Sequence, residues 1–220
     1  MRLRYTPMKG YVHTIEAVVN YCGLRDVIEP VATDPFDDIE SLLADNPLST
    51  VPTLLLETGE AIYGGPVIYE YLDTLHDSER LFPADHWLPV RRLLWMSDGL
   101  FDQWIRATRE VKEEPAMRRH EFIARQWSKV LRCMDHLEAL APGFKRLDIG
   151  QVRTVGSLSF IDKTFDLVIG LMETDALPDK FDWREGRPHL TKWYETLSTD
   201  RMFHLPLGKE RASRDGADKD

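Results

Sequence analysis

Three side chains near the amino terminus carry groups that can stabilise an anion. Tyr5 offers a phenol, Thr6 a hydroxyl and Lys9 an ammonium group. A phenol or a hydroxyl acts by donating a hydrogen bond, whereas a lysine ammonium acts as a strongly hydrated point charge on a flexible stem. Each residue also has an ordinary structural interpretation: Tyr5 as a packed strand residue, Thr6 as a turn residue beside Pro7, and Lys9 as a solvated loop residue. Residue type alone leaves these roles open.

A second group of residues could hold a ligand through backbone groups. Ser49-Thr50 precede a Val51-Pro52 pair, and Gly64-Gly65 precede Pro66. Pro66 fits the first turn of a helix, because the N–H group that proline lacks has no partner there in any case. The start of such a helix presents N–H groups and a positive dipole end to an anion, an attraction of about 0.3–1 kcal/mol. Gly64-Gly65 can add backbone N–H groups but no side-chain donor.

Histidine and cysteine residues form no metal-binding pattern along the chain. The seven histidines show no pair at metal-ligand spacing, and Cys22 and Cys133 form neither such a pair nor a CxxC motif. Both cysteines lie in segments with a helical pattern, where a thiol is usually a small buried hydrophobe. We therefore expect no metal site, and a reducing compartment.

Apolar periodicity predicts an α/β arrangement for the first 75 residues. The expected strands are residues 3–5, 27–31, 53–56 and 60–63, with helical patterns at 11–22, at 39–43 and from Pro66 onward. Gly59 lies where the third and fourth strands would turn into a hairpin. The order β-α-β-α-β-β-α is that of a thioredoxin-like sheet, and we assign it to a domain of residues 1–76.

The rest of the chain is predicted to be helical. Residues 77–87 are mostly polar and are interpreted as a linker to an all-helical bundle domain of residues 88–207. Two long amphipathic helices are expected, from Trp87 to about Glu114 and from Ala116 to Ala141. Ser159-x-x-Asp162 fits a capping box at the start of a later helix. The polar segment 208–220 is expected to be a disordered tail.

The composition argues against several classes of function. At 220 residues and 43% hydrophobic content, the chain can bury one large core or two small ones. Its net charge of −9 leaves no clustered excess of Lys and Arg for a phosphate backbone. No apolar run approaches the length of a membrane span, and the amino terminus lacks the apolar stretch of a signal peptide. We therefore expect a cytoplasmic protein without a nucleic-acid or membrane partner.

Taken together, these features resemble the cytosolic glutathione S-transferases over about residues 1–205. In that family a Val-Pro pair opens the third strand, an acidic-Ser pair begins the helix after the fourth, and a capping box lies in the helical domain. This chain has Val51-Pro52 at the first position, Gly64-Gly65 at the second and Ser159/Asp162 at the third. The resemblance implies a thioredoxin-like domain followed by a helical-bundle domain, a homodimer, and glutathione as co-substrate.

The resemblance also implies where a glutathione thiolate would be stabilised. Family members do this from the first strand or the loop that follows it, and the position of their catalytic Ser or Cys falls on Met8 or Lys9. Neither residue has a hydroxyl or a thiol. Tyr5, Lys9 and Thr6 are then the candidate catalytic residues, with Tyr5 matching the tyrosine-type classes in its distance from Gly23.

The glutathione-binding residues follow from the same resemblance. Pro52 would be cis, which lets the Val51 backbone pair with the cysteinyl part of glutathione. Ser49-Thr50 lie where relatives place a Lys or Gln near the glycyl carboxylate, and Gly64-Gly65 replace side chains that contact the γ-glutamyl group. Two lost hydrogen bonds to charged groups, at about 1.5–3 kcal/mol each, weaken binding by roughly two to four orders of magnitude. Glu at position 64 and Ser at position 65 should restore these contacts if the pocket is otherwise intact.

Two functions from different classes remain. The first is a glutathione S-transferase-like enzyme of detoxification, which conjugates glutathione to a small hydrophobic electrophile or otherwise activates it toward one; Val51-Pro52 supports this function. The second is a non-catalytic or repurposed transferase-fold protein with weak or no glutathione binding, serving as a ligand-binding or interaction module. Gly64-Gly65 and Met8-Lys9 support that alternative. The sequence favours the enzyme.

Overall fold

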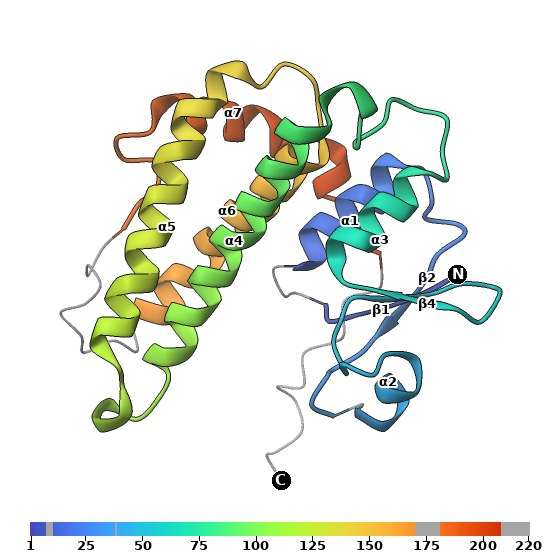
Figure 1. The fold of residues 1–220 in the computed structure, drawn as a ribbon, viewed down its shortest axis with the longest axis horizontal. Helices are drawn as coiled ribbons and strands as arrows, with labels where there is room; N and C mark the ends of the chain where they lie inside the picture. The colour runs from blue at the N-terminus through green and yellow to red at the C-terminus, as the bar shows by residue number, and fades with distance from the viewer. Residues whose placement is uncertain (8–10, 38, 170–180, 208–220) are drawn as a thin grey trace, which may run out of the picture. The chain divides into compact units, whose positions relative to one another are not determined.

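The chain forms two compact units in the computed structural model, which describes residues 1–7, 11–37, 39–169 and 181–207. The first unit comprises Met1–His76 together with the segment that begins at Arg201, and the second comprises Asp77–Asp200 (Figure 1). Each unit has its own buried apolar core. Among the described helices, none is both long and apolar enough to cross a bilayer.

The first unit is built on a four-stranded mixed sheet. Its strands are β1 (Arg2–Tyr5), β2 (Glu29–Ala32), β3 (Thr53–Leu55) and β4 (Ala61–Tyr63), in the order β2-β1-β3-β4. β1 pairs with β2 in parallel and with β3 antiparallel, and β3 and β4 form the expected antiparallel hairpin. Strand β2 starts two residues later than predicted, because the N–H groups of Val27 and Ile28 bond to the Leu24 carbonyl in a turn.

Three helices complete this unit. α1 (Tyr11–Tyr21) and α3 (Gly65–Asp73) lie on one face of the sheet, and α2 (Ile39–Asp45) lies on the other (Figure 1). Fully buried apolar side chains from the sheet and from α1 and α3 form the core under these helices. The Arg4 guanidinium ties α2 to β1 through a 2.5 Å contact with the Asp45 carboxylate. This is the thioredoxin-like arrangement that the sequence predicts.

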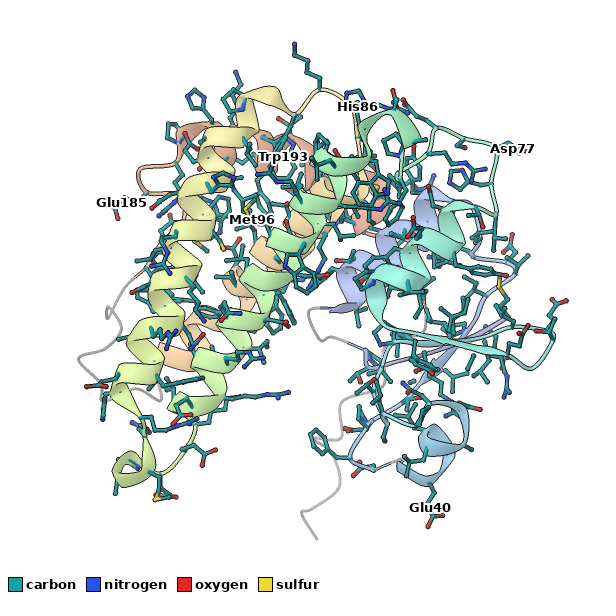
Figure 2. All side chains as sticks on the ribbon, viewed as in Figure 1. Glu40, Asp77, His86, Met96, Glu185 and Trp193 are labelled. Atoms are coloured by element: carbon teal, nitrogen blue, oxygen red, sulfur yellow. The ribbon has the colours of Figure 1, made fainter. Side chains whose placement is uncertain are left out.

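The second unit is a helical bundle. Its main helices are α4 (Trp87–Val111), α5 (His120–Leu140), α6 (Ile149–Ile169) and α7 (Pro188–Leu197), with short 3-10 turns η1 (Ala84–His86), η2 (Pro115–Met117) and η3 (Ala141–Gly143). Side chains such as Met96 fill the space between α4 and α5 (Figure 2). Helices α4 and α6 pack closely as well. A Cβ added at Gly150 of α6 would lie 2.7 Å from the side chain of Leu93 on α4.

The start of α6 does not fall where the sequence predicted it. Ser159 and Asp162 lie inside this helix, and so Ser159 is not its N-cap. The cap is Asp148, whose carboxylate accepts hydrogen bonds from the backbone N–H and the side-chain amide of Gln151. Asp162 instead accepts a hydrogen bond from the Trp183 indole at 2.6 Å and pairs with Arg184 at 2.7 Å. The predicted capping box is therefore wrong. Asp162 instead holds the loop that contains Trp183 and Arg184 against α6.

The unit boundaries also differ from the boundaries drawn on sequence. Residues 77–87 belong to the helical unit, where Leu81 is fully buried and its carbonyl accepts the Ile149 N–H. The segment 201–207, assigned on sequence to the helical domain, belongs to the first unit. The Asn20 amide donates to the Met202 and Leu205 carbonyls there, at 2.8 Å each. The predicted tail, 208–220, lies outside the described residues.

Candidate functional site

The strand register brings three loops to one end of the sheet in the first unit. Thr53 pairs with Arg4 on one side and with Tyr63 on the other. Continuing this register past the strands places Val51-Pro52 between the end of β1, at Tyr5 and Thr6, and the end of β4, at Gly64. The end of β1 and two segments more than forty residues further along the chain therefore meet at one sheet edge.

One peptide bond in the loop before β3 departs from the usual trans form. The Val51-Pro52 peptide bond is cis, as the resemblance implied. Val51 is half-buried and Pro52 buried, so the proline ring packs inward.

A buried asparagine, which the sequence analysis did not single out, organises this loop. The Asn46 amide donates to the Thr50 carbonyl at 3.0 Å, to the Thr50 hydroxyl at 3.1 Å and to the Thr53 hydroxyl at 3.0 Å. Its side-chain oxygen accepts the Leu48 N–H at 2.9 Å, and Asn46 is fully buried. The Leu48 bond is an Asx turn, a feature that Asn-Pro sequences favour and that could have been read from Asn46-Pro47. Thr50 is thus occupied in holding the loop.

Ser49 presents a hydroxyl with no partner among the described residues. Its Oγ atom is buried, and its backbone adopts the left-handed region at φ 47°. Buried hydroxyls in native proteins nearly always have a hydrogen-bond partner. An unpaired hydroxyl two residues before the cis bond therefore fits a loop that completes its hydrogen bonding with a ligand or with water.

The start of α3 offers backbone groups, as Gly64-Gly65 predicted. Gly64 is the N-cap residue, makes no side-chain cap and adopts φ 89° and ψ 121°. Only glycine adopts these angles readily, so a glutamate at position 64 would be strained. The first N–H groups of a helix have no partner within it and face outward toward an anion.

Gly65 differs from Gly64, because its side-chain space is already filled. A Cβ added there would lie 2.7 Å from the Tyr69 hydroxyl and 3.0 Å from the ring carbon that bears it. Tyr69 is only 1% exposed and cannot swing away into solvent. Tyr69 therefore occupies the space that a serine side chain at position 65 would need. The restoring pair of substitutions expected from the sequence therefore meets backbone strain at position 64 and a steric clash with Tyr69 at position 65.

The three candidate catalytic side chains differ in what the structure shows of them. Tyr5 is 4% exposed within β1, and this burial favours a packing role over a catalytic one. The Thr6 hydroxyl donates to the Thr33 carbonyl at 2.8 Å, a bond that ties the end of β1 to the residue after β2. Lys9 lies outside the described residues. The structure therefore brings Thr6 to the candidate site but gives its hydroxyl a structural partner.

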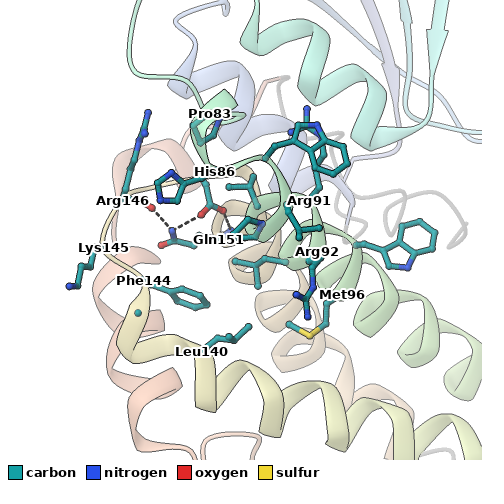
Figure 3. A pocket seen from close by; sticks show the side chains of 18 of the residues that line it. Pro83, His86, Arg91, Arg92, Met96, Leu140, Phe144, Lys145, Arg146 and Gln151 are labelled. Atoms are coloured by element: carbon teal, nitrogen blue, oxygen red, sulfur yellow. Dashed lines mark hydrogen bonds between the residues drawn. The ribbon is translucent and has the colours of Figure 1, made fainter.

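The second unit contains a separate cavity of about 910 Å³. Figure 3 shows Leu140 and Phe144 across the cavity from Met96 and Arg92. Its volume is in the range of pockets that hold drug-sized molecules. Phe101 and Trp104 lie on the same helix as Met96, but their side chains are buried in the core and do not line this cavity.

Two of the arginines that line this cavity have partners close by. The Arg91 guanidinium lies 4.9 Å from the centre of the Trp87 ring, and Arg146 pairs with Glu79 at 2.6 Å. Burial raises the pKa of Asp148, while its hydrogen bonds from Gln151 act in the opposite direction. The cavity is thus an apolar space with a cationic rim, suited to an apolar molecule that carries a negative group.

Comparison with known proteins agrees with this fold. Residues 10–75 match the family model "Glutathione S-transferase, N-terminal domain". A curated relative, the uncharacterized GST-like protein YibF of Escherichia coli K12, is 27% identical over 172 residues, which cover 77% of this chain and 80% of YibF.

Solved structures of the same fold cover nearly the whole chain. A glutathione transferase family member from Pseudomonas fluorescens Pf-5 with bound glutathione has a TM-score of 0.80 at 24% identity, covering 93% of this chain and 97% of that one. A glutathione S-transferase from Methylobacillus flagellatus KT with bound glutathione has a TM-score of 0.80 at 22% identity, covering 92% and 96%. Residues 10–75 therefore match the N-terminal domain of the glutathione S-transferases, and the chain as a whole has the fold of the glutathione transferases.

Proposed function

We propose that the protein is a cytoplasmic glutathione-dependent transferase that binds glutathione mainly through backbone groups. The observation that carries this proposal is the meeting of the Val51-Pro52 loop and the start of α3 at one end of the sheet. Relatives of the same fold were solved with glutathione bound. The reaction we propose is conjugation or activation of glutathione toward a small hydrophobic electrophile, a detoxification chemistry.

In this proposal, each part of the glutathione tripeptide contacts a different set of residues. The Val51 backbone pairs with the cysteinyl segment, Ser49 and Thr50 face the glycyl end, and the N–H groups at Gly65 and Val67 face the γ-glutamyl carboxylate. Lys9 is our first choice for stabilising the thiolate, since Tyr5 is buried and the Thr6 hydroxyl is already bonded to the Thr33 carbonyl. An ammonium beside a thiol favours its charged form and so lowers its pKa from the ordinary value of about 8.5.

Millimolar glutathione should stabilise the protein against heat. A ligand at 100 times its dissociation constant adds about 2.7 kcal/mol, which for a chain of this length raises Tm by roughly 5–10 °C. Differential scanning fluorimetry with reduced glutathione, and with an equimolar mixture of glutamate, cysteine and glycine as control, measures this directly. No rise in Tm up to tens of millimolar glutathione would overturn the proposed binding.

The alternative is a repurposed transferase fold that binds another ligand. The packing of Tyr69 against Gly65 and the cavity of about 910 Å³ in the second unit favour it. In that case an apolar carboxylate, such as a medium-chain fatty acid, raises Tm while glutathione does not. A Met96→Glu substitution in the cavity wall abolishes that rise only if the ligand lies there.

We also propose a homodimer through the α4–α5 face of the helical unit. Trp95 on α4 is 77% exposed, and it borders a shallow groove with Gln103 and Lys129. A large exposed aromatic residue beside a groove is typical of an interface centre, and its loss costs 2 kcal/mol or more, about 30-fold in affinity. Sedimentation equilibrium should show a dimer that Trp95→Glu weakens by at least this factor. Met117→Glu, at an equally exposed site on η2, should have no effect.

A further inference from the structure

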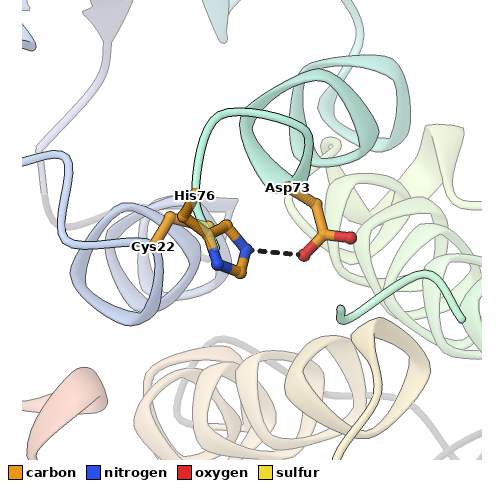
Figure 4. A group of neighbouring side chains, drawn as sticks. All are labelled: Cys22, Asp73 and His76. Carbon is orange, nitrogen blue, oxygen red and sulfur yellow. Dashed lines mark hydrogen bonds and ion pairs between the residues drawn. The ribbon is translucent and has the colours of Figure 1, made fainter. Parts of the chain in front are cut away.

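Three potential metal ligands meet at the carboxyl ends of two helices in the first unit. Cys22 follows α1 directly, Asp73 is the last residue of α3, and His76 lies three residues further on (Figure 4). Each offers one ligand atom, and these atoms all lie within 4.8 Å of one another. The sequence analysis did not expect this group, because the cysteine is about fifty residues from the other two and no linear spacing links them.

The geometry is close to what a tetrahedral metal ion needs. Zinc bonds of about 2.0–2.3 Å to sulfur, nitrogen and oxygen set the ligand atoms roughly 3–4 Å apart. His76 Nε2 and Asp73 Oδ1 are already 3.0 Å apart. The His76 ring also packs edge-on against Tyr21, with 5.7 Å between ring centres, which fixes its orientation. The most distant pair of ligand atoms therefore needs to move closer by only about 1 Å for all three atoms to reach one zinc ion.

The surroundings of this cluster favour the binding of a cation and disfavour a reactive, unbound Cys22 thiolate. The Cys22 N–H bonds to the Val18 carbonyl and the Thr74 N–H to the Tyr71 carbonyl, so both helices end beside the cluster. Helix carboxyl ends carry partial negative charge, which repels a thiolate and attracts a positive ion. Cys22 is 6% exposed and Asp73 2%, too little for attack on a substrate molecule.

We propose that Cys22, Asp73 and His76 bind one divalent ion of the zinc type, with water in the fourth position. A thiolate, an imidazole and a carboxylate together suit zinc or cobalt better than magnesium or calcium, which prefer oxygen ligands. The ion joins the end of α1 to the end of α3 and so stabilises the packing of these helices. This site is independent of the proposed glutathione chemistry.

The test uses the full chain after removal of metals with a chelator. Titration with Co²⁺ should produce the near-ultraviolet sulfur-to-cobalt absorption of a thiolate ligand, saturating at one ion per chain, and Zn²⁺ should displace it. Cys22→Ser should abolish that band, whereas Cys133→Ser, which removes the chain's other thiol, should leave it intact. No sulfur-to-cobalt band in the native chain, or a band lost in Cys133→Ser and kept in Cys22→Ser, overturns the proposal.

Stability provides a second readout that does not depend on the cysteine variant folding well. Zn²⁺ at 100 times its dissociation constant should raise Tm of the native protein by roughly 5–10 °C. Asp73→Asn keeps the side-chain shape but removes the charge, and should weaken zinc by at least about 100-fold, because losing a charged ligand costs no less than losing a residue that only supports one. Equal zinc affinity in the native chain and in Asp73→Asn would mean that the ion binds elsewhere.

Discussion

Replacing Asn46 with alanine should lower the free energy of unfolding by about 2–4 kcal/mol and weaken glutathione binding in addition. The fully buried Asn46 side chain takes part in four hydrogen bonds with Leu48, Thr50 and Thr53. Each is worth about 0.5–1.5 kcal/mol, and alanine replaces none of them. Urea unfolding measures the loss. Isothermal titration with glutathione measures the effect on the loop before the cis bond.

Two further variants separate the parts of this network. Asn46→Asp keeps the oxygen that accepts the Leu48 N–H but loses the amide that donates to Thr50 and Thr53, so it should be destabilised nearly as much as Asn46→Ala. Thr58→Ala removes an exposed threonine that bonds only within its own hairpin turn, and should change stability by less than about 0.5 kcal/mol. A comparable loss in Asn46→Ala and Thr58→Ala would contradict the role given to Asn46.

Local signals predicted the fold of this chain well. The hairpin around Gly59 and the helix that opens near Pro66 each depend on a few neighbouring residues, and each is present. The cis bond at Val51-Pro52, which the family resemblance implied, is also present. Turn and cap chemistry of this kind is set by short-range sterics. The element order of the thioredoxin-like domain followed from these signals.

The sequence-based prediction failed where a local pattern is compatible with more than one structure. Ser159-x-x-Asp162 fits a capping box, but Asp148-x-x-Gln151 caps the helix, and both patterns are equally visible in the sequence. Asp162 instead accepts a hydrogen bond from the indole of Trp183, a core residue twenty-one positions away. Such a contact depends on tertiary packing, which a capping pattern does not contain.

The same limit applies to the candidate site. The sequence showed which side chains Gly64-Gly65 lack, but not that Tyr69 fills the space beside Gly65. Residues 65 and 69 are neighbours on one helix face, so an i, i+4 contact was foreseeable. The short distance of this contact could not be foreseen, because it depends on how the tyrosine ring is buried. Any side chain at position 65 is therefore sterically coupled to Tyr69.

That coupling leads to the second prediction, on Gly65→Ser. Alone, this substitution should destabilise the protein by about 1–3 kcal/mol, the usual cost of overpacking, and should not improve glutathione binding. With Tyr69→Phe the hydroxyl at 2.7 Å is removed, leaving the ring carbon at 3.0 Å, which needs a shift of only a few tenths of an ångström. Chemical unfolding of both single variants and the double variant gives the coupling energy, which we expect to be about 0.5–3 kcal/mol.

Glutathione affinity in the same four proteins then tells the two proposed functions apart. A new serine hydroxyl that bonds the charged γ-glutamyl group adds about 1.5–3 kcal/mol, so the double variant should bind glutathione roughly 10- to 150-fold more tightly than Tyr69→Phe alone. Gly64 stays unchanged throughout, because its φ of 89° would strain any side chain. Equal affinity in the double variant and in Tyr69→Phe would mean that the γ-glutamyl group does not bind beside Gly65. A tenfold gain from Gly65→Ser alone, without loss of stability, would instead show that Tyr69 is no obstacle.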